Sequence, residues 1–231
     1  MSGLPAHLAG HAPAGLVAGA RVAQFELGSW KNFVYLLLDP TTRKAALVDP
    51  QEDLDTPLGA LEREGYELER VLVTHTHFDH VAGLPELLRR RPGLPVHLHR
   101  DDLHRLRPEH RASVQPVDDG GELRVGALRV VARHTPGHSA GHVCWEVPDL
   151  DPPLLLGGDC VFIRDCGRTD LETGDDEAMF ASLQRLKRLP PATVLLPGHH
   201  YKPEVASTLA QELETSPPFR CQSVDELRAL P

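Results

Sequence analysis

The sequence Thr74-His75-Thr76-His77-Phe78-Asp79-His80 places three imidazoles and one carboxylate within seven residues. The apolar segment Val71-Leu72-Val73 comes directly before it and predicts a buried strand that ends where the histidines begin. Alternate side chains of an extended chain share a face, so His75 and His77 can point the same way. Imidazole nitrogens and carboxylate oxygens bind zinc, iron and related metals. The stretch therefore predicts a metal site at the edge of a sheet.

The composition narrows the class of protein. The chain has 231 residues, of which 41% are hydrophobic, enough to fill the core of one large domain. A formal net charge of −9 disfavours a nucleic-acid or anionic-membrane binder. No apolar run approaches the roughly 20 residues that span a bilayer, and no basic leader with a cleavage site begins the chain. We therefore expect a cytoplasmic protein that acts on a small molecule, with neither nucleic acid nor membrane as a partner.

Periodicity gives the order of the elements. Residues 1–14 mix Gly, Ala and Pro without periodicity, so we expect an N-terminal arm there and a single domain over residues 15–231. Apolar residues recur on both sides of Gly28-Ser29, which predicts a hairpin of strands 16–27 and 32–38. The same rules predict strands over 44–48, 71–73, 95–99, 115–118, 122–125, 128–133, 142–147, 154–156 and 194–196, and helices over 54–64, 84–91, 176–189, 203–215 and 224–230.

This order predicts an α/β (α+β) fold of two mixed sheets flanked by helices. Hairpin turns, for which Asp119-Gly120-Gly121 is a candidate, occupy the middle of the chain, so an alternating parallel barrel fits less well.

Three other predicted strands end in a candidate ligand. His138 follows Thr135-Pro136-Gly137, Asp159 follows Gly157-Gly158, and His199 follows Pro197-Gly198. A loop after a strand presents its side chains at the sheet edge, and a neighbouring glycine permits close approach of the backbone. With the first motif, these residues supply five histidines and two aspartates, enough for two adjacent metals or for one metal with supporting residues.

The set His75-x-His77-x-Asp79-His80, followed by His138, Asp159 and His199, resembles the signature of the metallo-β-lactamase superfamily. The resemblance in order and spacing runs from about residue 16 to the last helix. It implies an αββα sandwich with the metal site at one edge of the two sheets.

Within that superfamily, the chain resembles the dinuclear hydrolases of the glyoxalase II type. That resemblance implies two Zn(II) ions or a mixed pair, and hydrolysis of glutathione thioesters by a metal-activated water. The first metal would be held by His75, His77 and His138, the second by Asp79, His80 and His199, and Asp159 would bridge them.

A narrower resemblance is to the persulfide dioxygenases, and it is our leading interpretation. It rests on Cys166-Gly167-Arg168-Thr169-Asp170, on Val117 to Glu122, on the segment from Ser207 to Leu227, and on the end of the chain soon after His199. It implies oxidation of glutathione persulfide with O2, giving sulfite and glutathione, at one Fe(II) per chain. Oligomers are common in that family, so we expect a homodimer.

The residues that this second resemblance implicates form two sets. One Fe(II) would be held by a triad of His75, His138 and Asp159, which leaves positions open for substrate sulfur and O2. The remaining members of the motif would support the triad from behind, and Tyr201 would contact substrate. Arg168 would either bind a substrate carboxylate or form a structural salt bridge with Asp165 or Asp170. The supporting residues are His77, Asp79, His80 and His199.

Other features are more typical of the hydrolases. They are Gly198 and His200 on either side of His199, Thr76 and Phe78 in the first motif, and Gly141-His142. Both families carry all seven candidate ligands, so the ligand set does not choose between them.

Overall fold

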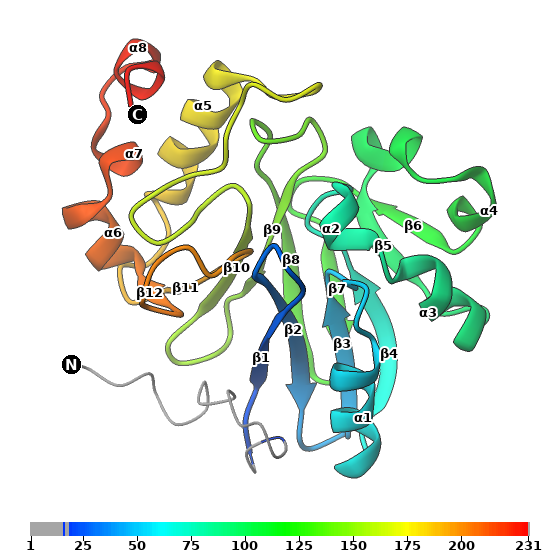
Figure 1. Cartoon of the computed structure of the whole chain (residues 1–231). Coiled ribbons are helices and arrows are strands. Elements are labelled where there is room, and N and C mark those ends of the chain that lie inside the picture. The colour runs from blue at the N-terminus through cyan, green and yellow to red at the C-terminus, as the bar shows by residue number, and fades with distance from the viewer. Residues whose placement is uncertain (1–15, 17–18, 231) are drawn as a thin grey trace.

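Two six-stranded sheets pack face to face, and helices cover their outer faces (Figure 1). The computed structural model describes residue 16 and residues 19–230. The predicted αββα sandwich of two mixed sheets is confirmed. The predicted arm over residues 1–14 lies outside the described residues, so the division of the chain at residue 15 stays a prediction.

The first sheet contains the N-terminal half of the chain in sequential order. Strands β1, β2 and β3 pair antiparallel, and β3 to β6 pair parallel. The parallel connections are made by helices, as parallel pairing requires. The strands are β1 (Val22–Leu27), β2 (Asn32–Asp39), β3 (Lys44–Val48), β4 (Glu67–Leu72), β5 (Val96–His99) and β6 (Val114–Val117).

The second sheet has the order β12-β11-β10-β9-β8-β7, and only β10 and β11 are parallel in it. Its strands are β7 (Glu122–Val125), β8 (Leu128–His134), β9 (Val143–Val147), β10 (Leu154–Gly158), β11 (Val194–Pro197) and β12 (Ser207–Thr208).

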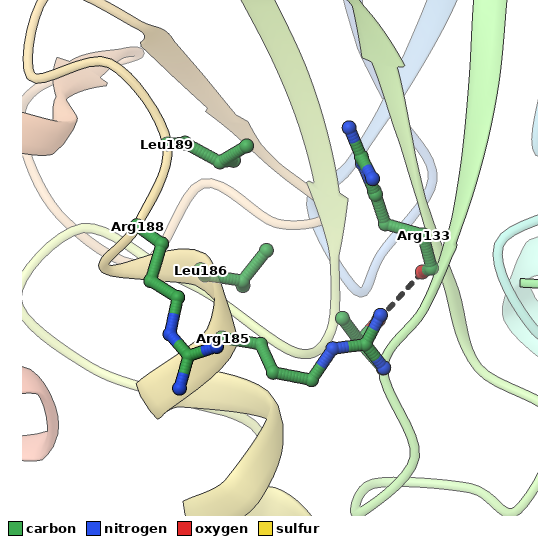
Figure 2. A pocket seen from close by; sticks show the side chains of 6 residues that line it. Arg133, Arg185, Leu186, Arg188 and Leu189 are labelled. Carbon is green, nitrogen blue, oxygen red and sulfur yellow. Dashed lines mark hydrogen bonds between the residues drawn. The ribbon is translucent and has the colours of Figure 1, made fainter. Parts of the chain in front are cut away.

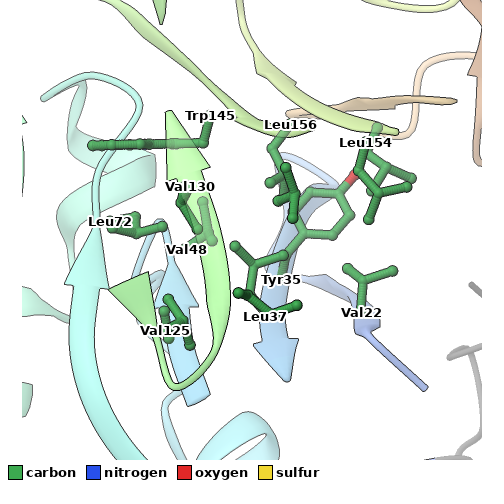
Figure 3. Close-up of a cluster of buried hydrophobic side chains, with 14 of the residues drawn as sticks. Val22, Tyr35, Leu37, Val48, Leu72, Val125, Val130, Trp145, Leu154 and Leu156 are labelled. Carbon is green, nitrogen blue, oxygen red and sulfur yellow. The ribbon is translucent and has the colours of Figure 1, made fainter. Parts of the chain in front are cut away.

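Strand β2 shows why the sheets need cover on both faces. All eight of its residues are buried. Phe33, Tyr35 and Leu37 point into the core between the sheets, whereas the alternate residues Leu36 and Leu38 point to the helices outside. Figure 3 shows Tyr35 and Leu37 facing Leu154 and Leu156 of the opposite sheet across this inner core.

The helices divide between the two outer faces. Helices α1 (Asp55–Arg63) and α3 (Leu84–Arg90) pack on the first sheet. Helices α5 (Asp176–Leu186), α6 (Leu209–Thr215), α7 (Pro217–Arg220) and α8 (Val224–Arg228) lie on the side of the second sheet (Figure 1). Short helices α2 (Phe78–Val81), η2 (Arg100–Arg105) and α4 (Pro108–Arg111) occupy loops of the first half of the chain.

Two local predictions were wrong. Asp119-Gly120-Gly121 is no hairpin turn, because β6 before it and β7 after it belong to different sheets. The predicted helix 203–215 begins only at Leu209, since Ser207 and Thr208 first pair with β11 as an edge strand. Thr208 then caps α6, and its reciprocal bonds with Gln211 form a capping box that the sequence pattern T-x-x-Q already carries.

No helix within residues 19–230 is both long and apolar enough to cross a bilayer.

The outer packing of α3 generates a stability test. Leu87 is fully buried against the first sheet, while its neighbour Leu88 is only partly buried. Leu87→Ala should lower the free energy of unfolding by about 2–5 kcal/mol, because it would leave a cavity that the surrounding side chains cannot fill. Leu88→Ala, the matched control, should cost markedly less. Urea unfolding measures both values, and equal losses would contradict this packing.

Candidate metal centre

The seven residues of the predicted site lie together, although they come from four separate places in the chain. His75 and His77 lie in the loop after β4, and α2 carries Asp79 and His80. The other three residues follow strands of the second sheet: His138 lies between β8 and β9, Asp159 follows β10, and His199 follows β11. The site is therefore built from the ends of strands of both sheets, as predicted.

Besides a cluster of His75, His80 and Asp159 that overlaps both, the donor atoms form two separate groups. His75, His77 and His138 make up the first donor group, and Asp79, His80 and His199 make up the second. Within each group, one ligand atom per residue lies within 4.8 Å of the others. This spacing is small enough for one metal ion to bind each group.

Asp159 lies between the two groups and faces both. Its Oδ1 is 3.3 Å from His80 Nε2, and its Oδ2 is 3.3 Å from His199 Nε2 and 3.5 Å from His138 Nε2. The same carboxylate can therefore complete the first group, complete the second, or bridge them.

Each imidazole with a fixed outer partner uses its Nδ1 atom for that partner. His138 Nδ1 donates to the Arg168 carbonyl at 2.8 Å, and His199 Nδ1 donates to the Trp30 carbonyl at 2.9 Å. His80 Nδ1 donates to Asp49 at 3.0 Å. Bonds of this kind fix the tautomer and the ring orientation, and they leave the Nε2 lone pair for a metal.

Among the seven candidate ligands, three buried side-chain atoms make no hydrogen bond within the described residues, although one of them, Asp159 Oδ1, lies 3.3 Å from His80 Nε2. They are His75 Nε2, His138 Nε2 and Asp159 Oδ1. Leaving a buried polar atom unpaired costs about 1–3 kcal/mol, so such atoms need an explanation. A bound metal ion would explain these atoms, because two imidazole nitrogens and a carboxylate oxygen are suitable ligands for iron or zinc.

In the second donor group, by contrast, two imidazole nitrogens lie within hydrogen-bonding distance of each other. His80 Nε2 lies 3.1 Å from His199 Nε2. Both rings donate their Nδ1–H groups elsewhere, so a hydrogen bond between the two Nε2 atoms requires one additional proton. The Asp79 carboxylate, 3.3 Å from His199 Nε2, helps to balance this charge. A proton can therefore occupy the second group where a metal would otherwise bind.

The pKa values of the two groups move in opposite directions. Burial lowers the pKa of His75 well below its ordinary range, lowers that of His77 to about 4, and lowers that of His138 as well. Burial also acts on His80 and His199, but the Asp159 carboxylate outweighs it and raises both pKa values. These shifts favour neutral imidazoles in the first group and protonated imidazoles in the second.

Several supporting residues were missed by the sequence analysis. Asp49, after β3, accepts hydrogen bonds from Thr74 N at 2.7 Å and Thr74 Oγ1 at 2.7 Å, as well as from His80. His142 Nε2 accepts from Asp159 N at 3.0 Å and holds the backbone of that residue. Asn32 Nδ2 donates to Asp79 at 2.9 Å. The sequence signal for Asp49 and His142 was that each is a polar residue at the boundary of a predicted strand. Asp49 follows the strand 44–48, and His142 begins the strand 142–147.

The glycine before His199 has the predicted role. A Cβ atom on Gly198 would lie 2.3 Å from Asp159 Oδ1. Any side chain at this position would therefore displace the carboxylate that faces both donor groups.

The two predicted substrate-binding residues differ in how their side chains are placed relative to the site. The ring of Tyr201 stacks on His199 with 4.8 Å between centroids and is 53% exposed, so it borders the site. Burial and the nearby Asp159 charge raise the pKa of Tyr201 to about 12. The guanidinium of Arg168 pairs with Asp170 at 2.6 Å, and only its backbone carbonyl touches the site, through His138.

A further group of potential ligands lies elsewhere. One ligand atom from each of His99, Asp101 and His134 lies within 4.8 Å of the others. The rings of His99 and His134 stack face to face at 3.8 Å with only 6° between their planes. Ring lone pairs lie in the ring plane, so those of two stacked rings run parallel and do not converge on one ion.

A cavity of about 300 Å³ lies between β8 and α5 and is lined by Arg133, Arg185 and Arg188 (Figure 2). Arg133 pairs with Glu146, and Arg185 pairs with Asp119. Figure 2 shows the three guanidinium groups pointing apart around Leu186 and Leu189. They do not converge on a single anion.

Comparison with known proteins agrees with this fold and site. Residues 28–199 match the metallo-beta-lactamase superfamily, and the chain belongs to that family.

Its relatives lie in the branch of the glyoxalase II enzymes and persulfide dioxygenases. A human hydroxyacylglutathione hydrolase-like protein is 40% identical over 178 residues, which are 74% of this chain but only 56% of the human protein. The crystal structure of ETHE1 from Myxococcus xanthus is 29% identical with a TM-score of 0.77, covering 91% of this chain and 92% of that one. A di-iron-bound form of the protein TTHA1623 is 32% identical with a TM-score of 0.71, covering 84% and 98%.

The opposite pKa shifts predict different pH dependences for metal binding. A proton and a metal compete for the same lone pair. Metal at the first group should persist until the pH approaches the lowered pKa values, about 4 for His77. Metal at the second group should be lost already as the pH falls through neutrality, because His80 and His199 bind protons more tightly than usual. Metal content after dialysis between about pH 5 and pH 8 measures this, and simultaneous loss from both groups would contradict it.

Asp49 generates a second test at this site. Its carboxylate helps to hold the pKa of His80 above the ordinary value, so Asp49→Asn should lower that pKa. NMR titration of the imidazole signals of metal-free protein follows the change. Glu52→Gln, three residues along the chain and exposed, removes the same charge without contact to the site and should leave His80 unchanged. An unchanged pKa in Asp49→Asn would show that Asp159 alone sets it.

Proposed function

We propose that this chain is a persulfide dioxygenase that binds one Fe(II) at His75, His138 and Asp159. The observation that carries the proposal is the contrast between the two donor groups. Within the triad, His75 Nε2 and His138 Nε2 have no hydrogen-bond partner and Asp159 Oδ1 has only His80 Nε2 nearby, at 3.3 Å, whereas the Nε2 atoms of His80 and His199 lie 3.1 Å apart and can share a proton. One metal ion bound to the triad would therefore supply a partner for its unpaired atoms.

The loop Cys166 to Asp170 supports the same proposal. It resembles the corresponding loop of the persulfide dioxygenases, and it contacts the triad directly. The Arg168 carbonyl orients His138, and a Cβ atom on Gly167 would lie 1.9 Å from the Asp159 carbonyl oxygen. The loop thus positions two of the three proposed ligands.

The proposed reaction consumes a glutathione persulfide, O2 and water, and it yields glutathione and sulfite. When bound, Fe(II) supplies the redox chemistry that lets O2 react with the outer persulfide sulfur. Two histidines and one carboxylate on one side leave room for both reactants on the other. His77, Asp79, His80 and His199 border the triad and hold the charge and protons around it.

Exposed aromatic side chains mark the proposed substrate entrance. Within the described part of the chain, the large hydrophobic residues that are exposed are Trp30 at 63%, Phe78 at 77% and Tyr201 at 53%. Each is tied to the site: the Trp30 carbonyl binds His199, Phe78 lies between His77 and Asp79, and Tyr201 stacks on His199. Tyr201 is the proposed substrate contact, and the Arg168 side chain would have to leave Asp170 to become one.

A second candidate is a dinuclear hydrolase of glutathione thioesters, with two Zn(II) ions or a mixed pair. The second donor group favours it, because its atoms lie 3.1–3.5 Å apart, close to the spacing of ligands on one metal. Asp159 also faces both groups, as a bridging ligand would. The human relative with hydrolase in its name points the same way.

The experiment that separates the two candidates measures metal and product together. Protein purified without added metal is analysed for iron and zinc, then given glutathione persulfide or S-lactoylglutathione while O2 uptake and thioester cleavage are followed. We expect one iron per chain, O2 consumption and sulfite from the persulfide. Two metals with thioester cleavage and no O2 uptake would replace this proposal with the second candidate.

Substitutions sharpen the same experiment. His138→Ala removes a ligand in either case and should abolish metal retention and activity. His199→Ala should keep one iron per chain if the triad alone binds metal, whereas it should halve the metal content of a dinuclear enzyme. His200→Ala is the matched control, because its ring binds Glu26 at 2.6 Å instead of the site.

A further inference from the structure

Asp102 is a buried carboxylate that accepts four hydrogen bonds. It lies in η2, after β5, and its exposed fraction is 0%. Its Oδ2 accepts from Thr76 N at 2.9 Å, from Thr76 Oγ1 at 3.1 Å and from Ser139 Oγ at 3.3 Å, while Oδ1 accepts from Gly141 N at 2.9 Å. All four donors are uncharged groups.

These donors belong to two loops that carry metal-binding histidines. Thr76 stands between His75 and His77, in the loop after a strand of the first sheet. Ser139 and Gly141 follow His138, in the loop between two strands of the second sheet. Asp102 itself lies just after β5, a strand of the first sheet. A single carboxylate thus joins the two loops whose histidines must meet at the first donor group.

The close approach of Gly141 shows that the second loop is shaped around Asp102. A Cβ atom at this position would lie 2.6 Å from Asp102 N and 2.6 Å from Asp102 Oδ1. Glycine is therefore required for the Gly141 N–H group to reach the carboxylate, and an alanine would force the two segments apart.

Burying a carboxylate is costly unless hydrogen bonds compensate for the lost water. An apolar side chain would fill the same space without that cost, so packing alone does not account for Asp102. Groups that orient metal ligands usually bind the ligand directly, as Asp49 does for His80. Asp102 instead binds the backbone on either side of the ligands.

We propose that Asp102 is a positioning residue that holds the two histidine loops in register across the sheets and so sets the metal affinity of the first donor group. The role is independent of whether the bound metal serves oxidation or hydrolysis, because it concerns binding alone.

The test compares Asp102→Asn with Asp101→Asn in the full chain. The asparagine amide keeps the size of the side chain but turns an NH2 group toward donors that need an acceptor. Cobalt(II) serves as the probe, with affinity measured by competition with a chelator. Asp102→Asn should bind cobalt(II) about 10–100-fold more weakly and change its visible absorption spectrum. Asp101→Asn alters the exposed neighbour and should match the unsubstituted protein.

A purely structural role gives a different result. If Asp102→Asn lowers the thermal stability of the metal-free protein but leaves cobalt(II) affinity and spectrum unchanged, the proposal is overturned. If that variant does not fold, Thr76→Val and Ser139→Ala each remove one hydroxyl donor from the same carboxylate. Weaker cobalt(II) binding by both would support the proposal, and unchanged binding by both would refute it. Loss of dioxygenase or hydrolase activity is not the readout, so failure of the proposed function leaves this test intact.

Discussion

The metal centre depends on one arrangement, in which imidazole Nδ1 atoms donate to fixed oxygens and the Nε2 atoms face the interior. The Arg168 and Trp30 carbonyls and the Asp49 carboxylate fix His138, His199 and His80 in this way. A buried imidazole without such a partner could rotate or change tautomer, and its lone pair would lose its direction. The oxygens come from loops far apart in sequence, so the sandwich must form before the centre can.

The fold supplies this arrangement because both sheets end their strands at one edge. Strand β2 is buried on both faces, which ties the inner core to the outer helices and leaves little freedom between layers. Polar residues then concentrate where the strands stop, and each buried polar atom needs a partner. Asp49, Asp102 and His142 meet that need by linking loops to one another. The same rule makes the unpaired atoms of His75, His138 and Asp159 informative.

Charge separates the two donor groups more clearly than geometry does. Both groups have atoms close enough for a metal, and Asp159 faces both. Burial keeps the first group neutral, whereas Asp159 favours protons on His80 and His199. The choice between one metal and two is thus a competition between a metal ion and a proton for the same nitrogen atoms.

The sequence by itself predicted the fold class, which the structure confirms, and seven candidate ligands, which the structure brings close together. Strand and helix periodicities are local properties, and the motif from His75 to His80 is dense enough to identify without a structure. Prediction from the sequence failed where contacts with distant segments determine the local structure. Ser207 and Thr208 form an edge strand because β11 lies beside them. Asp119 to Gly121 connect two different sheets because the strands on either side of them pair with other strands. Only the tertiary structure showed that Arg168 acts through its carbonyl, that Asp49 orients His80, and that Asp102 joins two loops. These contacts span 26 to 39 residues in the chain, and a hydrogen bond over such a separation leaves no periodic pattern in the sequence.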